Sequence, residues 1–365
     1  MTGLSPTIEA VDAAAYRFPT PQPEADGTLT WDATVAVTAT IRAGGQCGLG
    51  WTYSSEVTAN VITAHLAPCL EGRDAFDIAG GWTAMHRAGR NLGTRGLYMH
   101  ALSAVDIAWW DLKARLLGKP LNDLLGRCRD AVPVYGSGGF TNLTDRQLAD
   151  QVEAWSAAGC SAMKIKIGEG WGTSARRDLA RTRRLRGLAG PGIDLMVDAN
   201  GGYRRAQAQR VGHDLDELGV TWFEEPVSSD DVEALAAVRD EVRCDVAAGE
   251  YVYDQFDVNR LLPVVDCLQL DATRCGGYTG WLRGASSAQA RNLKVSAHCA
   301  PALHVSVAAA VPNTRHIEWF VDHARLEPQL VADAPEVRAG EAQVNRTAPG
   351  HGMTVNPAAD ARRVR

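Results

Sequence analysis

The sequence of 365 residues lacks the features that mark several large classes of protein. It has no run of roughly 18 apolar residues and no apolar segment near its start, so it predicts neither a membrane-spanning helix nor secretion. It has no excess of positive charge, because 37 Lys and Arg residues stand against 43 Asp and Glu, a formal net charge of −6. This balance argues against nucleic acid or an anionic membrane as the partner. We therefore expect a cytoplasmic protein that acts on a small molecule.

Paired cysteines are also missing. The eight cysteines form no CxxC motif and no regular framework in a chain of this length, so we interpret them as reduced thiols that mostly pack. The remaining composition, 45% hydrophobic and 22% charged, is that of an ordinary globular protein. The length is sufficient for one large domain and one smaller domain, at about 150 residues per domain.

What the sequence does contain is a series of short apolar runs that each end in an acidic residue. The runs VDAN, WFEEP, AAGE and LQLD place Asp198, Glu224, Glu250 and Asp271 at successive intervals of 26, 26 and 21 residues. Such intervals suit one strand and one helix per step, which predicts a βα barrel whose strand ends meet at one mouth. Carboxylates that converge there need a cation, and an all-oxygen ligand set favours Mg²⁺ over zinc. We therefore predict a Mg²⁺ site made by Asp198, Glu224 and Glu250, with Glu225 behind Glu224.

The order of patterns along the chain predicts an α/β protein: a modified (β/α)8 TIM barrel with an N-terminal α+β capping domain. Residues 1–128 form the capping domain, with strands at 31–42 and 49–53 and helices at 56–66 and 97–117. Residues 129–330 form the barrel, and residues 331–365 form a loop-rich tail that returns to the capping domain through its GHGM segment at 350–353. The barrel strands are expected at 132–136, 162–167, 193–198, 220–223, before Glu250, before Asp271, at 295–297 and at 316–320.

Strand two contains the sequence KIK, in which Lys164 and Lys166 share one face. An exposed edge strand is the simpler interpretation of such a pair taken alone. In a barrel, however, the neighbouring apolar residues cover the outer face and both lysines point into the mouth. Desolvation and the neighbouring cation would then lower the pKa of each lysine toward that of a base.

Strands six to eight supply a carboxylate, an imidazole and a second carboxylate. Asp271 and His298 end adjacent strands, and a carboxylate bonded to one imidazole nitrogen leaves the other nitrogen free to transfer protons. His304 and His316 are interpreted as structural. Glu318 lies between Ile317 and Trp319, a setting in which it is expected to stay protonated and donate a hydrogen bond.

This constellation resembles the enolase superfamily, mandelate racemase group. The likeness rests on KxK on strand two, acidic ligands on strands three to five, the DxxxxGG segment from Asp271 to Gly277, and His298 and Glu318 on the last two strands. The stretch DIAWWDLKARLLGKPL at 106–121 is similar to the capping domain of the same group, so the resemblance covers nearly the whole chain. Arg274 stands where some members of the group carry lysine.

The resemblance implies removal of the proton α to a carboxylate, and a homo-oligomer. Mg²⁺ and Lys164 would bind the substrate carboxylate, Glu318 would donate a hydrogen bond to it, and Lys166 and His298 would flank the α-carbon. With a hydroxyl on the β-carbon, the outcome is a sugar-acid dehydratase making a 2-keto-3-deoxy acid, which is favoured by the similarity. A racemase or epimerase and a lactone cycloisomerase use the same residues. A metal-binding scaffold without turnover is the alternative of a different class.

Specificity is expected to come from the capping domain, where loops at 18–27 and 51–53 would close over the mouth. The segment 17–27 holds three prolines, which predicts a loop, and its side chains at 20, 22, 24 and 26 suit a polyol. The acids Glu24 and Asp26 would repel a second carboxylate, which favours a monocarboxylate substrate. Four residues complete the predicted substrate contacts: Trp51, Tyr53, Ser137 and Asn200.

Overall fold

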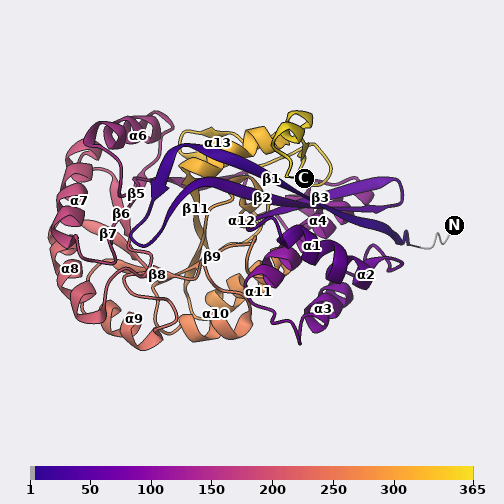
Figure 1. The fold of residues 1–365 in the computed structure, drawn as a ribbon, viewed down its shortest axis with the longest axis horizontal. Coiled ribbons are helices and arrows are strands. Elements are labelled where there is room, and N and C mark those ends of the chain that lie inside the picture. Colours follow the sequence, from indigo (N-terminus) through magenta and orange to yellow (C-terminus); the bar gives the residue numbers. More distant parts are fainter. Residues whose placement is uncertain (1–4, 365) are drawn as a thin grey trace.

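The computed structural model describes residues 5–364 and contains a closed parallel barrel beside an antiparallel sheet with helices (Figure 1). The barrel closes because its last strand pairs with its first. Each strand is followed by a helix that packs on the outside, so the predicted (β/α)8 barrel is confirmed. The barrel strands, in chain order, are β4 (Ala131–Gly138), β5 (Ala162–Lys166), β6 (Asp194–Asp198), β7 (Val220–Glu224), β8 (Asp245–Ala248), β9 (Cys267–Leu270), β10 (Lys294–Ala297) and β11 (Thr314–Phe320).

A helix follows each barrel strand. The first of them starts with a capping box, in which Thr144 and Gln147 exchange hydrogen bonds. The helices are α6 (Asp145–Ala157), α7 (Ala175–Ala189), α8 (Arg205–Glu217), α9 (Val232–Arg239), α10 (Gln255–Leu261), α11 (Gly277–Gln289), α12 (Pro301–Ala308) and α13 (Val321–Leu330). No described helix is long and apolar enough to cross a membrane.

The alternation of side chains along the strands divides the barrel into an apolar exterior and two interior layers. On β5, Met163 and Ile165 belong to the main hydrophobic core beneath the helices, whereas Lys164 and Lys166 face inward. A separate apolar layer of the interior consists of Tyr135, Ala162, Met196, Trp222, Ala247 and Cys267. Charged groups border this layer: Lys164 Nζ lies 5.3 Å from the centroid of the Tyr135 ring, and the Arg315 guanidinium lies 5.1 Å from that of the Trp222 ring.

The capping domain is a three-stranded antiparallel meander covered by helices. Its strands are β1 (Ile8–Ala25), β2 (Thr30–Ala43) and β3 (Gln46–Tyr53), and α4 (Leu97–Leu116) packs across β3. The single helix expected at 56–66 is instead α1 (Thr58–Val61), a π-helix η1 (Ile62–Leu66) and α2 (Ala67–Leu70). Helix α3 (Ile78–Ala88) was not predicted from the sequence.

The loop expected at 18–27 is wrong in conformation, because β1 continues as a strand to Ala25. Residues 51–53 end strand β3, which agrees with the strand expected at 49–53 and not with the closing loop expected at 51–53. Prolines are tolerated in β1 because it is the edge strand of the sheet, where a missing N–H costs little. The pairing of β1 with β2 slips between Pro19 and Glu24, so the proline stretch is a local irregularity inside one long hairpin.

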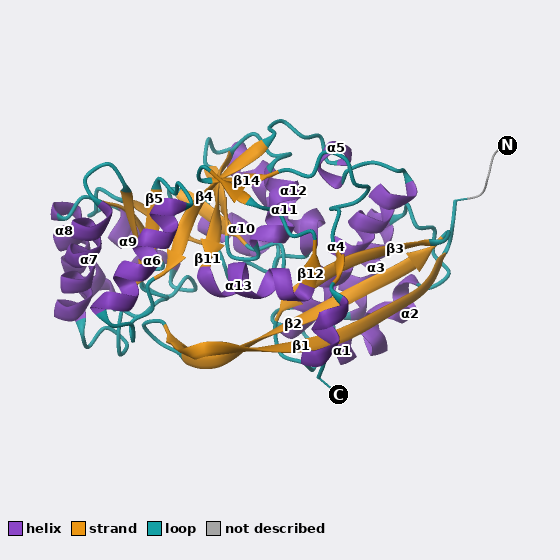
Figure 2. Ribbon diagram, turned by 90° about the horizontal axis from the view of Figure 1, so that it is seen from above, coloured by secondary structure: helices purple, strands orange, loops and turns teal. Residues whose placement is uncertain are grey.

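The hairpin of β1 and β2 reaches from the capping domain past the carboxyl ends of the barrel strands (Figure 2). Its tip is fixed to the barrel: the Trp171 amide donates to the Gly27 carbonyl at 3.0 Å, and the Thr141 amide donates to the Ala25 carbonyl at 2.8 Å. A side chain at Gly27 would meet the carbonyl oxygen of Ile167 at 2.5 Å. Glycine therefore permits the close approach that holds the hairpin over the mouth.

The tail contacts both parts of the molecule. Strand β14 (Glu341–Gln343) pairs with β13 (Val337–Arg338) and antiparallel with β4, and β15 (Thr354–Val355) pairs with β12 (Val331–Ala332). Farther on, the His351 ring contacts the Leu49 carbonyl at 2.8 Å, and the His351 amide donates to Asp111. The short helix α5 (Leu121–Leu124) precedes the barrel in the chain. The short helix η2 (Pro357–Arg362) follows the contacts of the tail. The domain boundaries at 128 and 330 remain a prediction.

Candidate active site

Three carboxylates from neighbouring strands meet at the mouth of the barrel. Asp198 ends β6 and is paired in register with Glu224, the last residue of β7. Glu250 is the second residue after the end of β8. Their oxygens lie within 4.8 Å of one another, and all three side chains are buried. The equal spacing of the acids along the sequence thus corresponds to adjacent positions around the barrel.

The two lysines of β5 lie against these acids. The Lys164 Nζ atom is 2.6 Å and 2.7 Å from the two oxygens of Glu224 and 2.9 Å from Glu318 Oε1, and the Lys166 Nζ atom contacts Asp198 Oδ2. Burial by itself lowers the pKa of each lysine, but the carboxylates outweigh it and raise both pKa values well above the ordinary value. The expected lowering is therefore wrong for this arrangement, because the acids lie closer to each lysine than the sequence pattern implies.

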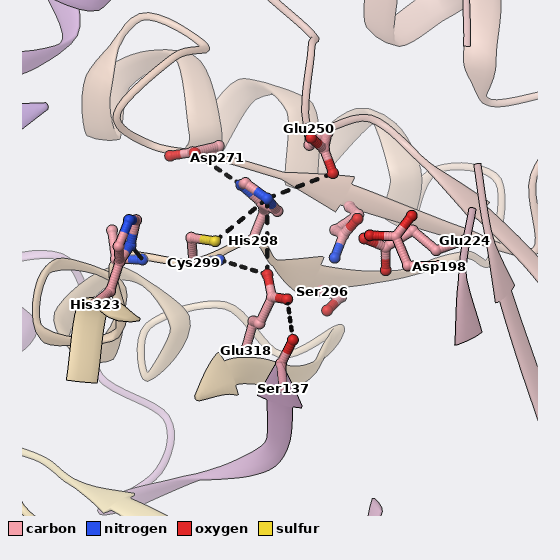
Figure 3. A network of polar contacts seen from close by, with 12 residues as sticks. Ser137, Asp198, Glu224, Glu250, Asp271, Ser296, His298, Cys299, Glu318 and His323 are labelled. Atoms are coloured by element: carbon pink, nitrogen blue, oxygen red, sulfur yellow. Dashed lines mark hydrogen bonds and ion pairs between the residues drawn. The ribbon is translucent and has the colours of Figure 1, made fainter. Parts of the chain in front are cut away.

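His298 is oriented by Asp271. Its Nδ1 atom is 2.9 Å from Asp271 Oδ2, and since a carboxylate only accepts, the proton lies on Nδ1. The Nε2 atom faces Glu250 Oε2 at 3.4 Å and Glu318 Oε2 at 3.8 Å (Figure 3). Burial lowers the pKa of His298, yet Glu250 and the hydrogen bond to Asp271 raise it above the ordinary value overall. The free nitrogen is thus basic and directed into the mouth.

Glu318 accepts hydrogen bonds rather than donating one. Its oxygens accept from the Ser137 hydroxyl at 2.6 Å and from the Cys299 amide at 2.8 Å, beside the Lys164 ammonium. Burial raises the pKa of Glu318, but Lys164 and His298 outweigh burial and hold the pKa well below the ordinary value. The protonated Glu318 expected from its apolar sequence neighbours is therefore wrong here. The cause is the Lys164 ammonium, which the flanking residues do not reveal.

A cavity of about 300 Å³ opens between the barrel mouth and the hairpin. The barrel supplies charged and polar lining residues, which are Lys166, Asn200, Glu250, Asp271, Arg274 and His298. The capping domain supplies Asp26, Leu29, Trp31, Ala33, Thr34, Val35, Tyr53 and Ser54. Asn200 has a left-handed backbone with φ of 44°, and its buried Oδ1 has no hydrogen-bond partner. An unpaired amide oxygen in the lining is suited to accept a hydrogen bond from a bound molecule.

Two predicted substrate contacts do not line this cavity. Trp51 is fully buried, where its Nε1 donates to the Tyr53 hydroxyl at 3.2 Å, so it supports Tyr53 from behind. The Ser137 hydroxyl is occupied by Glu318. Both residues lie in strands. The alternation of a strand predicts that a side chain points inward, but it does not predict whether a neighbouring side chain covers it. The predictions for Trp51 and Ser137 as direct contacts are therefore not supported by their positions.

Sequence reasoning missed several residues that line the cavity, among them His323 and Cys299. The His323 ring stacks on Tyr53 with centroids 3.6 Å apart, and its Nδ1 accepts from the Ala300 amide, so the ring presents Nε2–H. Burial lowers the pKa of His323 to about 4, which keeps it neutral. Its place three residues after a barrel strand was an available signal. Cys299 has φ of 49°, which turns two consecutive side chains toward one cavity and breaks the alternation expected of a strand.

The ligand set fits a hard divalent cation. Every donor among the three acids is oxygen, and Glu250 Oε2 is buried without a hydrogen-bond partner. Burial and Asp198 raise the pKa of Glu224 to about 8, and burial and Glu250 raise the pKa of Glu225. Six carboxyl groups in this region face three permanently charged cations: Asp198, Glu224, Glu225, Glu250, Asp271 and Glu318 against Lys164, Lys166 and Arg274. A divalent cation would neutralise this excess.

Comparison with known proteins matches two successive stretches of the chain. Residues 11–126 match the family description "Mandelate racemase / muconate lactonizing enzyme, N-terminal domain", and residues 147–359 match "Enolase C-terminal domain-like". A mandelate racemase/muconate lactonizing enzyme-like protein from Rubrobacter xylanophilus has a crystal structure that superposes with a TM-score of 0.95 at 40% identity, covering 98% of this chain and 100% of that chain.

Two curated enzymes are also similar. The 3,6-anhydro-alpha-L-galactonate cycloisomerase of Streptomyces coelicolor is 31% identical, covering 96% of this chain and 97% of that enzyme. The L-talarate/galactarate dehydratase of Salmonella typhimurium is 31% identical over 87% of this chain and 78% of that enzyme. The crystal structure of this dehydratase with Mg and L-lyxarohydroxamate superposes with a TM-score of 0.91 at 29% identity, covering 99% of this chain and 94% of that chain.

Proposed function

Because the chain belongs to the mandelate racemase/muconate lactonizing enzyme family of the enolase superfamily, we propose that it removes the proton α to the carboxylate of an acid sugar and expels the β-hydroxyl. The product is a 2-keto-3-deoxy acid. The observation that carries the proposal is that Lys166 and the His298–Asp271 pair line one cavity at the edge of the three-acid site. Two proton-transfer groups and a cation site at one cavity are what this reaction requires.

Asp198, Glu224 and Glu250 would hold Mg²⁺. When bound, the cation supplies positive charge that makes the α-proton more acidic and stabilises the anion left when the proton departs. The lysines belong to the same charge balance, since Lys164 lies against Glu224 and Lys166 against Asp198. Glu318 is a positioning residue in this proposal, because it ties Lys164 to Ser137 and to the backbone of Cys299.

Lys166 and His298 carry the proton transfers. One of them takes the α-proton in its neutral form, and for Lys166 that form requires a bound cation to offset the Asp198 charge that raises its pKa. The electron pair of the broken C–H bond stays on the substrate, shared with its carboxylate. The His298 imidazolium then gives its Nε2 proton to the β-oxygen as the C–O bond breaks, so the hydroxyl leaves as water. The resulting enol takes up a proton at carbon to give the ketone. Asp271 keeps the His298 ring in the orientation that aims Nε2 at the cavity.

The charges of the lining favour a substrate with one carboxylate. Lys166 and Arg274 are the Lys and Arg side chains that line the cavity within the described chain, and each already contacts acids. The wall from the capping domain contributes Asp26, neutral polar side chains such as Thr34 and Ser54, and apolar side chains, with no Lys or Arg. A second carboxylate at that end would be desolvated beside Asp26 without a partner, which is unfavourable.

The experiment that tests the function is incubation with Mg²⁺ in D₂O with matched monocarboxylate and dicarboxylate acid sugars and 2-hydroxy acids. The α-proton is followed by NMR, and 2-keto product is trapped with semicarbazide. Exchange with 2-keto product supports dehydration, and inversion without loss of water would show a racemase or epimerase instead. Opening of an anhydro or lactone ring would show a cycloisomerase. Absence of exchange across the whole panel would contradict the proposal and favour a scaffold.

We also propose a cytoplasmic homo-oligomer. All eight cysteines are free thiols, which suits a reducing compartment. Phe256 on α10 is 80% exposed and Trp171 is 65% exposed, and large apolar side chains of this kind often pack against a second subunit. Light scattering after size exclusion should give a mass that is a multiple of 39.1 kDa, and a monomer at all concentrations would contradict the oligomer.

A further inference from the structure

A second cluster of metal-ligating atoms lies beside the three-acid site. His298 Nε2, Cys299 Sγ and a carboxylate oxygen of Glu318 all lie within 4.8 Å of one another, and all three side chains are buried (Figure 3). The Sγ atom is 3.3 Å from Nε2, and Glu318 Oε2 is 3.8 Å from Nε2. The proton-transfer scheme uses His298 and Glu318 but gives no role to the thiol.

The backbone holds the cluster together. Cys299 and Ala300 both have left-handed backbone conformations, with φ of 49° and 39°, which turn the thiol toward the ring of its own neighbour. The Cys299 amide donates to Glu318 Oε2 at 2.8 Å, so the same residue also fixes the third ligand. Asp271 holds the opposite face of the imidazole through Nδ1 at 2.9 Å. A carboxylate behind a histidine is the usual support of a histidine that binds a metal.

We propose that His298, Cys299 and Glu318 form a binding site for a thiophilic divalent cation of the Zn²⁺ class. A thiolate, an imidazole nitrogen and a carboxylate are a zinc ligand set, in contrast to the all-oxygen set of the three acids. Zinc–sulfur and zinc–nitrogen bonds of about 2.3 Å and 2.0–2.1 Å, at a tetrahedral angle, separate sulfur and nitrogen by about 3.5 Å. The two atoms are 3.3 Å apart. The fourth position is left to a water molecule, because Glu250 belongs to the three-acid site.

Binding at this site inhibits the reaction. On binding, the Cys299 thiol releases its proton to solvent and the His298 Nε2 lone pair is donated to the cation. The imidazole then has neither a proton to give nor a lone pair to take one. The binding itself stands independently of the proposed function, whereas the inhibition rests on it. Because the ligand sets differ, excess Mg²⁺ is not expected to displace the thiophilic cation.

The direct test is a Co²⁺ titration of the full chain in excess Mg²⁺. We expect one equivalent to give a thiolate-to-cobalt absorption band in the near ultraviolet, and Zn²⁺ to abolish it by displacement. Cys299→Ser should remove the band and weaken Zn²⁺ binding by about 100-fold or more, and Asp271→Asn should weaken it by about 10- to 100-fold. Cys299→Ala serves as a second variant. The exposed cysteines provide matched controls, so Cys47→Ser and Cys128→Ser should leave the band unchanged.

A band that persists in both Cys299 variants, or Zn²⁺ binding that is lost only when Mg²⁺ fills the three-acid site, would overturn the proposed site. The inhibition is measured separately as the loss of α-proton exchange caused by Zn²⁺, relative to the zinc-free rate of the same variant. Cys299→Ser should raise the inhibitory Zn²⁺ concentration by the same factor as the dissociation constant. Zinc that binds without slowing exchange would overturn the inhibitory role alone. A chain inactive on every substrate would overturn the proposed function, while the cobalt band would still decide the site.

Discussion

The barrel end and the capping wall of the cavity are built on opposite principles. At the barrel end, buried charges are packed against one another, as where Lys164 lies 2.6 Å from Glu224. At the wall, Leu29 and Trp31 present apolar surface, and the capping domain contributes the acid Asp26. The carboxylate of Asp26 accepts from the Thr28 and Leu29 amides, and Glu24 is buried with a pKa raised to about 8 by burial and by Asp322.

The comparison shows how one scaffold separates reaction from selectivity. Charges in a buried, compensated cluster cannot be changed singly without leaving a partner uncompensated, so the barrel end is resistant to substitution. The wall carries little charge, and a side chain such as Leu29, which is 64% exposed, can change size or polarity at small cost. We therefore expect large effects from changes at the barrel end and small, substrate-dependent effects from changes at the wall.

The largest effect should follow from removing either proton-transfer group. Lys166→Met and His298→Asn should each lower the rate of product formation by about 10²- to 10⁴-fold, because a positioned acid or base contributes that much. Leu29→Ala, at the wall, should change the rate by less than about tenfold in the same assay. Steady-state kinetics on variants with unchanged circular dichroism gives the ratio. A loss at Leu29 as large as that at His298 would break the division between the two regions.

The next effect concerns magnesium and stability. Because Mg²⁺ would bind the folded three-acid site, Mg²⁺ at 100 times its dissociation constant should raise the free energy of unfolding by about 2.7 kcal/mol. Glu250→Gln removes a ligand and should abolish most of this increment. Asp26→Asn, a neutralised acid at the wall, should retain it. Urea unfolding with Mg²⁺ and with a chelator measures both, and an increment kept by Glu250→Gln would remove Glu250 from the metal site.

A smaller effect at the wall should depend on pH. The folded-state pKa of Glu24 is raised from 4.5 to about 8, first by burial and then by Asp322. A carboxyl with a raised pKa binds its proton more tightly when folded, so its stabilising contribution is full below pH 4.5 and is lost as pH rises toward 8. The side chain of Glu24→Gln stays neutral. Between pH 5 and pH 8 the free energy of unfolding of this variant should therefore fall by about 1–2 kcal/mol less than that of the wild type, after discounting for partial solvent access.

The change in the pH dependence of Glu24→Gln is measured by urea unfolding at several pH values. The exposed Glu153 on α6 provides the control, and Glu153→Gln should follow the wild-type curve. Equal slopes for Glu24→Gln and the wild type would show that Glu24 is ionised in the fold and would weaken the view that the wall is nearly uncharged.

The smallest effect should be a shift in substrate preference. Leu29 is 64% exposed and lines the wall, so Leu29→Arg would add the cation that the wall lacks. An exposed ion pair is worth about 0.2–1 kcal/mol, so the kcat/KM of a dicarboxylate relative to its monocarboxylate should rise by about 1.4- to fivefold. Leu29→Gln is the uncharged control. An equal shift with glutamine would assign the preference to shape rather than charge.

The sequence predicted the barrel end far better than the wall. The acids at 198, 224 and 250 each end a short β-branched or apolar run. The alternation of side chains along a strand predicts the direction in which these acids point, so their convergence could be expected. Asp271 and His298 end adjacent strands for the same reason. The segment at 18–27 was misjudged because prolines signal a loop locally, whereas an edge strand of a long hairpin tolerates them. His323 and Cys299 were missed because the chain departs from the strand period where they occur.

The sequence by itself determined the barrel, the capping domain and the set of acids, lysines and imidazole at the mouth, since periodicity and strand length are local properties of the chain. Only the tertiary structure decided which of these groups are charged. The pKa values of Glu318 and the lysines depend on partners far away in the chain, such as Lys164 and Glu318, which are 154 residues apart. The same long-range packing brought the hairpin over the mouth and placed the Cys299 thiol beside His298, contacts that no local pattern specifies.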